Sequence, residues 1–301
     1  MTLLIPLPGN DAMTARLAEL NHYEVGALGV HTFPDGETRL RFLADVSGRD
    51  IVLICSLEHP NEKFLPLAFA AATARDLGAR RIGLVAPYLC YMRQDKRFHT
   101  GEAVTSQIFA DLISRSFDWM MTVDPHLHRT KSLGEIYSIA TRVLHAGPVL
   151  AGWIRDNVAT PVLIGPDEES RQWTEAVATR CGAPFAIFQK QRLGDRDVRT
   201  IPPQFLLPKG ATPIVLDDII SSGTTMLETL RLLTPMTPQP PIAMAIHGVF
   251  AEHARAAIMG TGARLVTSNS VPGAGGVIDL SPLIAQSLKE MDRPLGEMGR
   301  V

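Results

Sequence analysis

Two acidic and four hydroxyl side chains crowd the segment 214–225. Its apolar first part, Ile214–Leu216, is typical of a buried strand, and the carboxylates of Asp217 and Asp218 follow at the expected carboxyl end. A short loop then leads into an expected helix. Backbone N–H groups at a helix start, together with hydroxyls, form a cradle for phosphate. The residues of this cradle are Ser221, Ser222, Gly223, Thr224 and Thr225.

Two carboxylates beside a phosphate group would repel it unless they contact something else. Sugar hydroxyls and Mg²⁺ are natural partners for such carboxylates, so the segment predicts binding of a phosphorylated sugar. A Ser-Gly-Thr sequence alone is often only a helix cap, and the two preceding acids are what favour a site. The sequence contains no G-x-x-x-x-G-K-[ST] and no G-x-G-x-x-G after a strand, which excludes two common nucleotide motifs.

Other residues suited to polyphosphate chemistry follow further expected strands. Arg93–Arg97 contains three cations within five residues, which suits a polyphosphate but is also typical of a solvated surface. Lys190 and Arg192 are separated by one residue. If their segment closed over a triphosphate, the two cations would stabilise the charge that develops on its phosphates. Taken alone, the pair indicates only an exposed basic turn. Asp124 and His126 combine a carboxylate with an imidazole, which can hold hydrated Mg²⁺ or contact phosphates.

An aromatic and two acidic side chains surround the Pro-Asp-Gly sequence near residue 35. Phe33 would stack on a purine, while Asp35 and Glu37 would accept hydrogen bonds from its amino group or hold a neighbouring loop. Pro-Asp-Gly by itself predicts only a turn.

Together these segments resemble the ribose-phosphate pyrophosphokinase family, which has the type I phosphoribosyltransferase fold. Residues 214–225 resemble the phosphoribosyl pyrophosphate loop of that fold. Residues 31–37 resemble the family's F-x-D-G-E adenine loop, residues 88–97 its R-Q-D segment for ATP, and residues 189–192 its mobile catalytic K-x-R loop. The strand end Thr122–His126 resembles V-D-L-H, with proline for leucine as in the archaeal-type branch.

The resemblance implies a Mg²⁺-dependent transfer of the diphosphoryl group of ATP to the C1 hydroxyl of ribose 5-phosphate, which yields 5-phosphoribosyl 1-pyrophosphate and AMP. It implies a homo-oligomer, because the adenine loop of this family reaches the nucleotide of a neighbouring subunit. The general base stays open between Asp217 and a hydroxide on the metal. The implied site residues are Lys190 and Arg192 for catalysis; Phe33, Asp35, Glu37, Arg93, Gln94, Asp95 and His126 for ATP; Asp217, Asp218 and 221–225 for ribose 5-phosphate; and His126 and Asp167 for Mg²⁺.

One segment departs from the family pattern. The pyrophosphate loop of the family is D-x-G-G or close to it, whereas this chain continues from Asp167 with Glu168 and Glu169. Either Mg²⁺ bridges these acids to the pyrophosphate, or Arg171 supplies the positive field, or the activity is altered.

Three other functions remain open on the sequence. A phosphoribosyltransferase would use the same sugar-phosphate loop without an ATP segment. A non-catalytic regulator or partner of an active synthetase would fit the acids at Glu168 and Glu169. A metal hydrolase built around His126 and His128 is disfavoured, because no further ligand set follows matching strand ends.

Composition restricts the partners and the compartment. The 29 Lys and Arg residues against 31 Asp and Glu residues give a net charge of −2, so no global cationic field is available to hold nucleic acid or an anionic membrane. The cysteines, Cys55, Cys90 and Cys181, are odd in number and without any C-x-x-C, which predicts a reduced cytoplasmic protein without disulfides. The sequence predicts neither a signal peptide nor a membrane span.

Short apolar runs rich in Val and Ile alternate with helical patterns along the chain. Continuous rather than alternating apolar strands predict mainly parallel sheets flanked by helices on both faces. Because the pattern restarts after Gly147-Pro148, the sequence predicts two consecutive α/β domains, 1–147 with the ATP segments and 148–301 with the sugar-phosphate and catalytic loops. We expect residues 289–301 to be a polar tail.

Overall fold

A computed structural model describes residues 2–127, 129–192, 198–201 and 207–291. They fall into two compact units. Unit 1 consists of the chain up to Leu144 together with the chain from Leu280, and unit 2 is His145–Asp279. The division differs from the predicted one at its C-terminal end, because α8 (Ser281–Met291) belongs to unit 1 rather than to the second domain.

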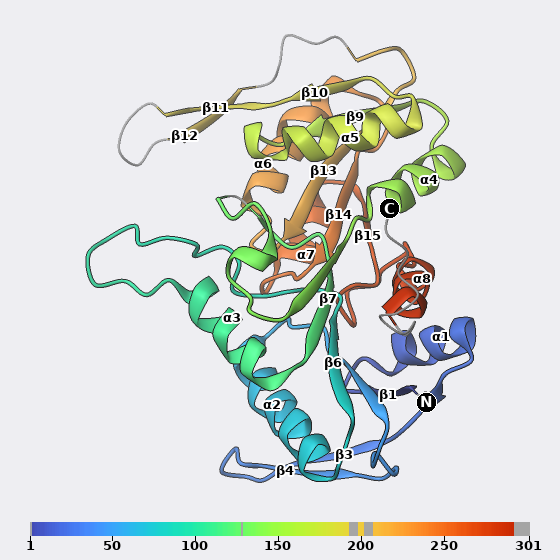
Figure 1. Ribbon diagram of the computed structural model, residues 1–301. Helices are drawn as coiled ribbons and strands as arrows, with labels where there is room; N and C mark the ends of the chain where they lie inside the picture. The colour runs from blue at the N-terminus through green and yellow to red at the C-terminus, as the bar shows by residue number, and fades with distance from the viewer. Residues whose placement is uncertain (1, 128, 193–197, 202–206, 292–301) are drawn as a thin grey trace, which may run out of the picture. The chain divides into compact units, whose positions relative to one another are not determined.

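Unit 1 is built on a six-stranded, wholly parallel sheet (Figure 1). Its strands pair in the order β2-β1-β5-β6-β7-β8. The residues of the central strands are buried, as in Ile51–Ile54 with exposed fractions of 0–1%, which accounts for the continuous apolar runs in the sequence. The strands are β1 (Thr2–Pro6), β2 (Glu24–Val25), β5 (Asp50–Ile54), β6 (Arg81–Ala86), β7 (Trp119–Val123) and β8 (Ala140–Leu144).

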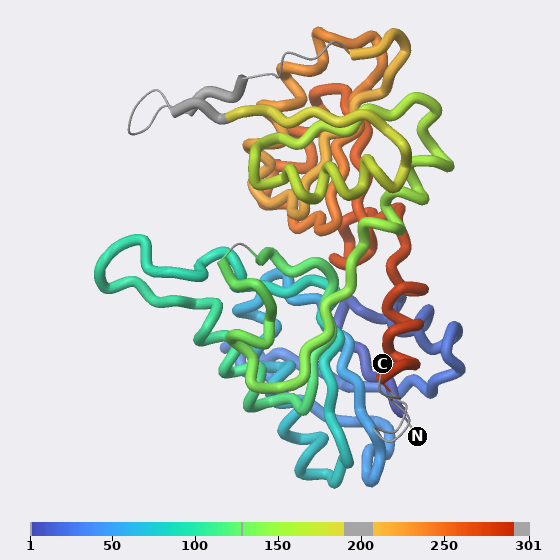
Figure 2. The backbone as a smooth tube through the Cα atoms, turned by 45° about the horizontal axis from the view of Figure 1, so that its top comes forward, coloured from blue at the N-terminus to red at the C-terminus, as the bar shows by residue number. Residues whose placement is uncertain are grey.

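Helices cover both faces of this sheet, α2 and α3 on one and α1 and α8 on the other (Figure 1). Helix α8 runs beside α1 in Figure 2, and Asn21 Nδ2 at the end of α1 donates to Ala285 O over 2.7 Å. An antiparallel hairpin of β3 (Leu28–Thr32) and β4 (Thr38–Phe42) forms a separate two-stranded sheet. The remaining elements are α1 (Asp11–Asn21), α2 (Pro60–Asp76), α3 (Thr105–Ser116) and the short 3₁₀ helix η1 (Leu133–Glu135).

Unit 2 has a five-stranded parallel sheet in the order β10-β9-β13-β14-β15. An antiparallel hairpin, β11 (Gln189–Arg192) with β12 (Val198–Ile201), stands apart from it. The other elements are the strands β9 (Pro161–Gly165), β10 (Phe185–Ile187), β13 (Thr212–Ile220), β14 (Ile242–Gly248) and β15 (Arg264–Thr267); the helices α4 (Gly147–Asn157), α5 (Arg171–Cys181), α6 (Thr224–Leu233) and α7 (Ala254–Gly260); and the 3₁₀ helices η2 (Glu168–Ser170) and η3 (Thr234–Met236).

The two units repeat one topology. In each, the first strand lies beside an edge strand, an antiparallel hairpin follows, and the later strands, four in unit 1 and three in unit 2, extend the sheet in chain order. By this order β5 corresponds to β13, and the β3–β4 hairpin corresponds to β11–β12. The prediction of two α/β units with parallel sheets flanked by helices is therefore confirmed. None of the helices in the described parts of the chain is long and apolar enough to span a membrane.

Candidate active site

The two consecutive aspartates lie inside a strand rather than after it. The sequence predicted a strand that ends at Leu216, whereas β13 continues to Ile220. Strand β9 pairs with β13 only as far as Val215, while β14 accompanies it to its end. Asp217 and Asp218 therefore lie where β13 extends beyond β9, at the carboxyl edge where parallel sheets bind ligands.

The carboxylates of Asp167, Asp217 and Asp218 act on one another, and we refer to them as the acidic edge. Burial is the main cause that raises the pKa of Asp217 well above its ordinary value, and the charges of Asp218 and Asp167 raise it further. The N–H of Asp218 donates to Asp217 Oδ1 over 3.0 Å, which offsets only part of this effect. A bound cation or a set of hydroxyl donors would relieve this repulsion.

The phosphate cradle predicted from the sequence forms a tight turn into α6. Gly223, which precedes the helix, has a φ of 74°, and no side chain caps this helix start. Ser222 Oγ and Thr224 Oγ1 lie 3.2 Å apart on the exposed surface of the turn. The backbone of Ser221 is fixed by a hydrogen bond, in which its carbonyl accepts from the N–H of Ala251 over 2.9 Å. The turn thus presents hydroxyls and a helix N-terminus, the groups that bind phosphate.

Asp167 starts the 3₁₀ helix after β9 and is fixed by a reciprocal cap. Its Oδ1 accepts from the N–H of Ser170 over 3.3 Å, and the Ser170 hydroxyl lies 3.4 Å from the N–H of Asp167 and donates to the Asp167 carbonyl. Arg171 forms an exposed bidentate ion pair with Glu168, which lowers the pKa of Glu168. Arg171, which the sequence suggested as a source of positive charge for the pyrophosphate, is therefore paired with Glu168.

Lys190 and Arg192 lie in a strand, not in the loop expected from the sequence. Both belong to β11, and the register places Lys190 opposite Thr200 and Arg192 opposite Val198 of β12. Apolar alternation does not reveal this strand, because its sequence Gln-Lys-Gln-Arg is polar throughout. The catalytic role predicted for the two cations stays a prediction.

The residues of the expected adenine loop cap the β3–β4 hairpin. The N–H of Phe33 donates to Glu37 O over 2.7 Å, and the N–H of Glu37 donates to Asp35 Oδ1 over 3.1 Å, so Asp35 shapes the turn itself. The Phe33 ring is 39% exposed, and its one described ring contact is an edge-to-face contact with His31 at 4.8 Å. An exposed phenyl ring at a hairpin tip remains available for stacking.

The R-Q-D segment lies in the irregular stretch between β6 and α3. Asp95 is nearly buried, with a side chain 4% exposed, and pairs with Arg129 over 2.8 Å. Gln94 accepts at Oε1 from Thr105 over 3.1 Å, at the start of α3. Arg93 is exposed. The segment is thus anchored through Gln94 and Asp95, and the anchor Arg129 carries no motif that would have identified it in the sequence.

Asp124 and His126 follow β7, as predicted. Asp124 is buried and has a positive φ of 34°, unusual for a residue other than glycine and frequent at functional sites. The two predicted Mg²⁺ ligands belong to different units, His126 to unit 1 and Asp167 to unit 2. In the described ranges, no group of three or more His, Cys, Asp or Glu side chains is arranged to hold a metal ion.

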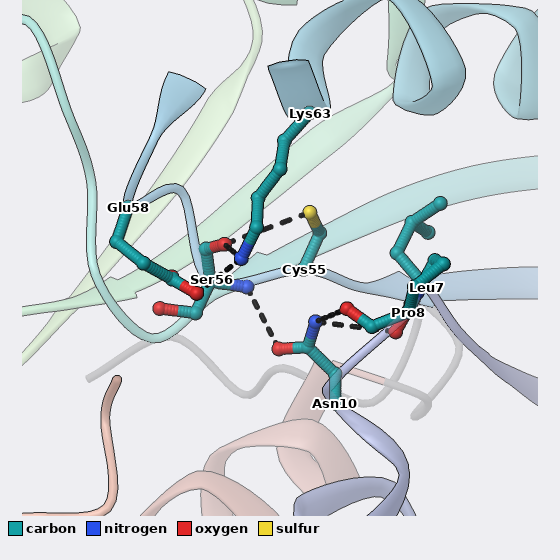
Figure 3. Close-up of polar contacts among 7 residues, drawn as sticks. All are labelled: Leu7, Pro8, Asn10, Cys55, Ser56, Glu58 and Lys63. Atoms are coloured by element: carbon teal, nitrogen blue, oxygen red, sulfur yellow. Dashed lines mark hydrogen bonds and ion pairs between the residues drawn. The ribbon is translucent and has the colours of Figure 1, made fainter. Parts of the chain in front are cut away.

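Four further polar residues gather where β1 and β5 end, and they form a network that sequence reasoning missed (Figure 3). The N–H of Ser56 donates to Asn10 Oδ1 over 2.9 Å, and Lys63 Nζ donates to Ser56 O over the same distance and to Glu58. Glu58 is buried, and its Oε2 has no hydrogen-bond partner. The network sits in unit 1 at the place that the sugar-phosphate turn occupies in unit 2.

The three cysteines are free thiols. Burial raises the pKa of Cys55 to about 12 and raises that of Cys90 also, so both stay protonated at neutral pH. Cys90, although it precedes the R-Q-D segment, is therefore a small apolar residue of the core rather than a nucleophile.

Comparisons with known proteins cover both units. Residues 2–116 match the N-terminal domain of ribose phosphate pyrophosphokinase, and residues 132–257 match the phosphoribosyl transferase domain. The ribose-phosphate pyrophosphokinase of Sulfurisphaera tokodaii is 29% identical over 85% of this chain and 89% of its own length. Ribose-phosphate pyrophosphokinase 2 of Archaeoglobus fulgidus is also 29% identical, over 95% of this chain and 99% of its own.

A solved structure has the same fold. The phosphoribosylpyrophosphate synthetase of Mycobacterium smegmatis superposes with a TM-score of 0.84 at 24% sequence identity, over 96% of this chain and 98% of that one. Both domain models, the relatives and the repeated topology agree with the family resemblance read from the sequence. The chain belongs to the ribose-phosphate pyrophosphokinase family.

Proposed function

We propose that this chain transfers the β,γ-diphosphoryl group of ATP to the C1 hydroxyl of ribose 5-phosphate and forms 5-phosphoribosyl 1-pyrophosphate and AMP. The observation that carries the proposal is the acidic edge beside the hydroxyl-rich turn into α6. This arrangement combines acceptors for sugar hydroxyls with donors for a phosphate.

Within unit 2, the turn 221–225 binds the 5-phosphate and the carboxylates of Asp217 and Asp218 accept hydrogen bonds from the ribose hydroxyls. The raised pKa of Asp217 makes it a better proton acceptor than an ordinary aspartate, which suits a general base near neutral pH. Asp217 is therefore our candidate for the group that takes the proton of the C1 hydroxyl as its oxygen attacks Pβ.

The nucleotide is assigned to residues of unit 1. Phe33 stacks on the adenine, with Asp35 and Glu37 beside it, while Arg93, Gln94 and Asp95 contact the ATP. The new bond forms between the C1 oxygen and Pβ, and the bond from Pβ to the oxygen that bridges it to Pα breaks, so that AMP leaves. Lys190 and Arg192 neutralise the charge that grows on the transferred group and on the leaving phosphate.

Mg²⁺ is the proposed cofactor. Mg²⁺ prefers oxygen ligands, keeps several waters and is commonly held by one or two carboxylates together with substrate phosphates. The acidic edge fits such an ion, since its crowded carboxylates raise the pKa of Asp217, whereas a closed cage of three protein ligands is missing from the described residues. Asp167 of the acidic edge is the residue proposed to hold it, and when bound it would offset the charge of the phosphates. His126, the other ligand predicted from the sequence, belongs to unit 1, and its role stays a prediction.

We further propose that the protein is a cytoplasmic homo-oligomer. Its proposed partners are ATP and ribose 5-phosphate, and neither nucleic acid nor membranes are among them. The buried, protonated thiols support a reducing compartment. The exposed Phe33 ring supports contact with a nucleotide held elsewhere in the assembly.

The test is a turnover assay on purified protein with ATP, Mg²⁺ and ribose 5-phosphate. We expect AMP release that depends on the sugar phosphate. Tight binding of both substrates without AMP release would instead support a regulator of another synthetase, the alternative favoured by Glu168 and Glu169. Failure to bind ATP analogues would favour a phosphoribosyltransferase.

A further inference from the structure

Tyr91, just before the R-Q-D segment, has an unusual backbone conformation. Tyr91 has a φ of 57°, in the left-handed region that bulky residues rarely adopt. It lies two residues before Arg93, so its backbone angles set the direction in which the chain enters the segment. A residue keeps such a conformation only when its surroundings hold it there.

The side chain of Tyr91 is held from the start of α2. Its hydroxyl donates to Oδ1 of Asn61, in the first turn of that helix. Its ring lies 4.9 Å from the ring of Phe109 on α3, which in turn packs against Phe64 at 5.3 Å. Tyr91 and Asn61 also line a cavity of about 340 Å³ between α2 and α3. Packing therefore encloses the tyrosine ring only in part. The hydrogen bond to Asn61 fixes the side chain where packing alone does not.

A second tie reaches the same stretch from the loop before α2. The N–H of Leu57 donates to Tyr88 O over 3.0 Å. That loop is itself fixed by Lys63 on α2, which binds Ser56 O and Glu58, and by Asn10, which accepts from the N–H of Ser56 (Figure 3). The loop before α2 thus holds the chain at Tyr88, and the first turn of α2 holds it at Tyr91, just ahead of Arg93.

We propose that Tyr91 is a positioning residue for ATP, acting through its hydrogen bond to Asn61. The bond keeps Tyr91 in its left-handed conformation and thereby directs Arg93 and Gln94 toward the nucleotide. The proposal rests on the assignment of these two residues to ATP. The role differs from that of a catalytic residue, because Tyr91 acts on the backbone of its neighbours and not on the reacting atoms.

The test compares Tyr91→Phe with the wild-type enzyme. The substitution removes one hydroxyl and keeps the ring contact with Phe109. We expect the KM for ATP and the Kd for a non-hydrolysable ATP analogue to rise about 3- to 10-fold, the range set by one hydrogen bond. We expect the KM for ribose 5-phosphate to stay unchanged and the Tm to fall by no more than about 4 °C, the shift that about 1 kcal/mol causes in a domain of this size.

Asn61 supplies the second arm. Asn61→Asp keeps an acceptor oxygen and should retain the affinity for ATP, whereas Asn61→Ala should reproduce the loss of Tyr91→Phe. The double variant Asn61→Ala with Tyr91→Phe should lose no more than either single variant, because both remove the same bond. Tyr137→Phe is the matched control, since the buried Tyr137 hydroxyl has no hydrogen-bond partner.

An unchanged KM and Kd for ATP in Tyr91→Phe would overturn the proposal, as would an equal rise in the KM of both substrates. Additive losses in the double variant would also overturn it. The binding arm keeps the inference separate from the proposed activity: a wild-type protein that binds the analogue without releasing AMP contradicts the activity, while the binding of the variants still decides the role of Tyr91.

Discussion

At the scale of single residues, Asp217 has the most unusual environment in the candidate site. The sequence identified it as one of two adjacent acids, but the third carboxylate, Asp167, is 50 residues away and comes from the end of β9. Only the pairing of β9 with β13 brings them together. The raised pKa of Asp217 is therefore a consequence of the fold.

The first prediction concerns Asp217→Asn. Because the folded protein holds the proton of Asp217 more tightly than the unfolded chain does, ionisation of this group costs stability. The stabilisation is fully present below the unfolded pKa, about 3.9, and is lost as the pH rises through the raised pKa of the folded state. At about pH 4 we expect the variant and the wild type to have the same Tm. At about pH 8 the Tm of the variant should be the higher one, by about 2–4 °C for each kcal/mol of destabilisation that the substitution removes.

Melting curves across this pH range, measured without ligands, provide the check. Asp156→Asn, at an exposed position on α4, is the control and should track the wild type at every pH. A difference between Asp217→Asn and the wild type that does not grow with pH would contradict the prediction. Turnover by Asp217→Asn should be strongly reduced if Asp217 accepts the proton.

The second prediction concerns Lys190→Ala. A cation that acts on charge developing in the transition state affects turnover more than nucleotide binding. We expect kcat to fall about 10²- to 10³-fold, as for other single groups of this kind, with little change in the Kd for an ATP analogue. Lys209→Ala removes an exposed lysine of the same unit and should behave as the wild type. Equal losses in kcat and affinity would refute the transition-state role.

At the scale of elements, the turn into α6 joins local conformation to packing. Gly223 has a left-handed φ of 74°, and a Cβ added to it would lie 3.3 Å from Ile258 Cδ1 and 3.5 Å from Ala254 Cβ on α7. The backbone angle therefore favours glycine at this position, and the neighbouring helix leaves little room for a Cβ. Its small size keeps the start of α6 close to α7.

The third prediction follows from this contact. Gly223→Ala should lose about 1–2 kcal/mol from the left-handed backbone and more from the crowding against Ile258. Gly210→Ala isolates the backbone cost, because Gly210 has a φ of 79° with nothing within 4 Å of an added Cβ. We expect denaturation to show the larger loss for Gly223→Ala. The KM for ribose 5-phosphate should rise about tenfold in that variant alone, roughly the effect of one phosphate hydrogen bond. Equal effects of the two substitutions would count against this account of the turn.

The hairpins show where element prediction failed. The sequence indicated loops at 31–37 and 189–192. Residues 33–37 are indeed the turn between β3 and β4, whereas 189–192 is strand β11, and the two hairpins hold the same place in their units. Strands β3 and β4 contain no buried residue, and the sequence of β11 is polar throughout, so apolar periodicity does not reveal these hairpins. Tertiary topology was needed to recognise that the expected adenine loop and the expected catalytic segment are counterparts.

At the scale of the whole molecule, the last described helix, α8, belongs to unit 1 although it follows unit 2 in the sequence. Helix α8 packs against α1, and its Ile284, Ala285 and Leu288 side chains are 0–3% exposed. An amphipathic sequence predicts a helix but not the surface that the helix covers. Unit 1 therefore depends on residues from both ends of the chain.

The fourth prediction concerns Leu288→Ala. Removing this buried side chain should lower the stability of unit 1 by about 2–5 kcal/mol, the usual cost of a buried Leu to Ala substitution. Hydrogen exchange should accelerate in α1 and the unit 1 sheet while the unit 2 sheet keeps its protection. Lys289→Ala changes the exposed neighbour on the same helix and should leave both units unchanged. Faster exchange confined to unit 2 would show that α8 has been assigned to the wrong unit.

The sequence by itself determined the fold class, the family and the identity of most candidate site residues. Continuous apolar strands predict parallel sheets, and glycine, hydroxyl and acid residues at strand ends predict phosphate and sugar contacts, because these signals are local. The tertiary structure decided which distant groups meet. It placed Asp167 beside Asp217, paired Arg129 with Asp95, brought Asn61 to Tyr91 and returned α8 to unit 1. Each of these contacts joins residues far apart along the chain, and the free energy that selects them comes from burial and pairing between elements, which local sequence patterns do not record.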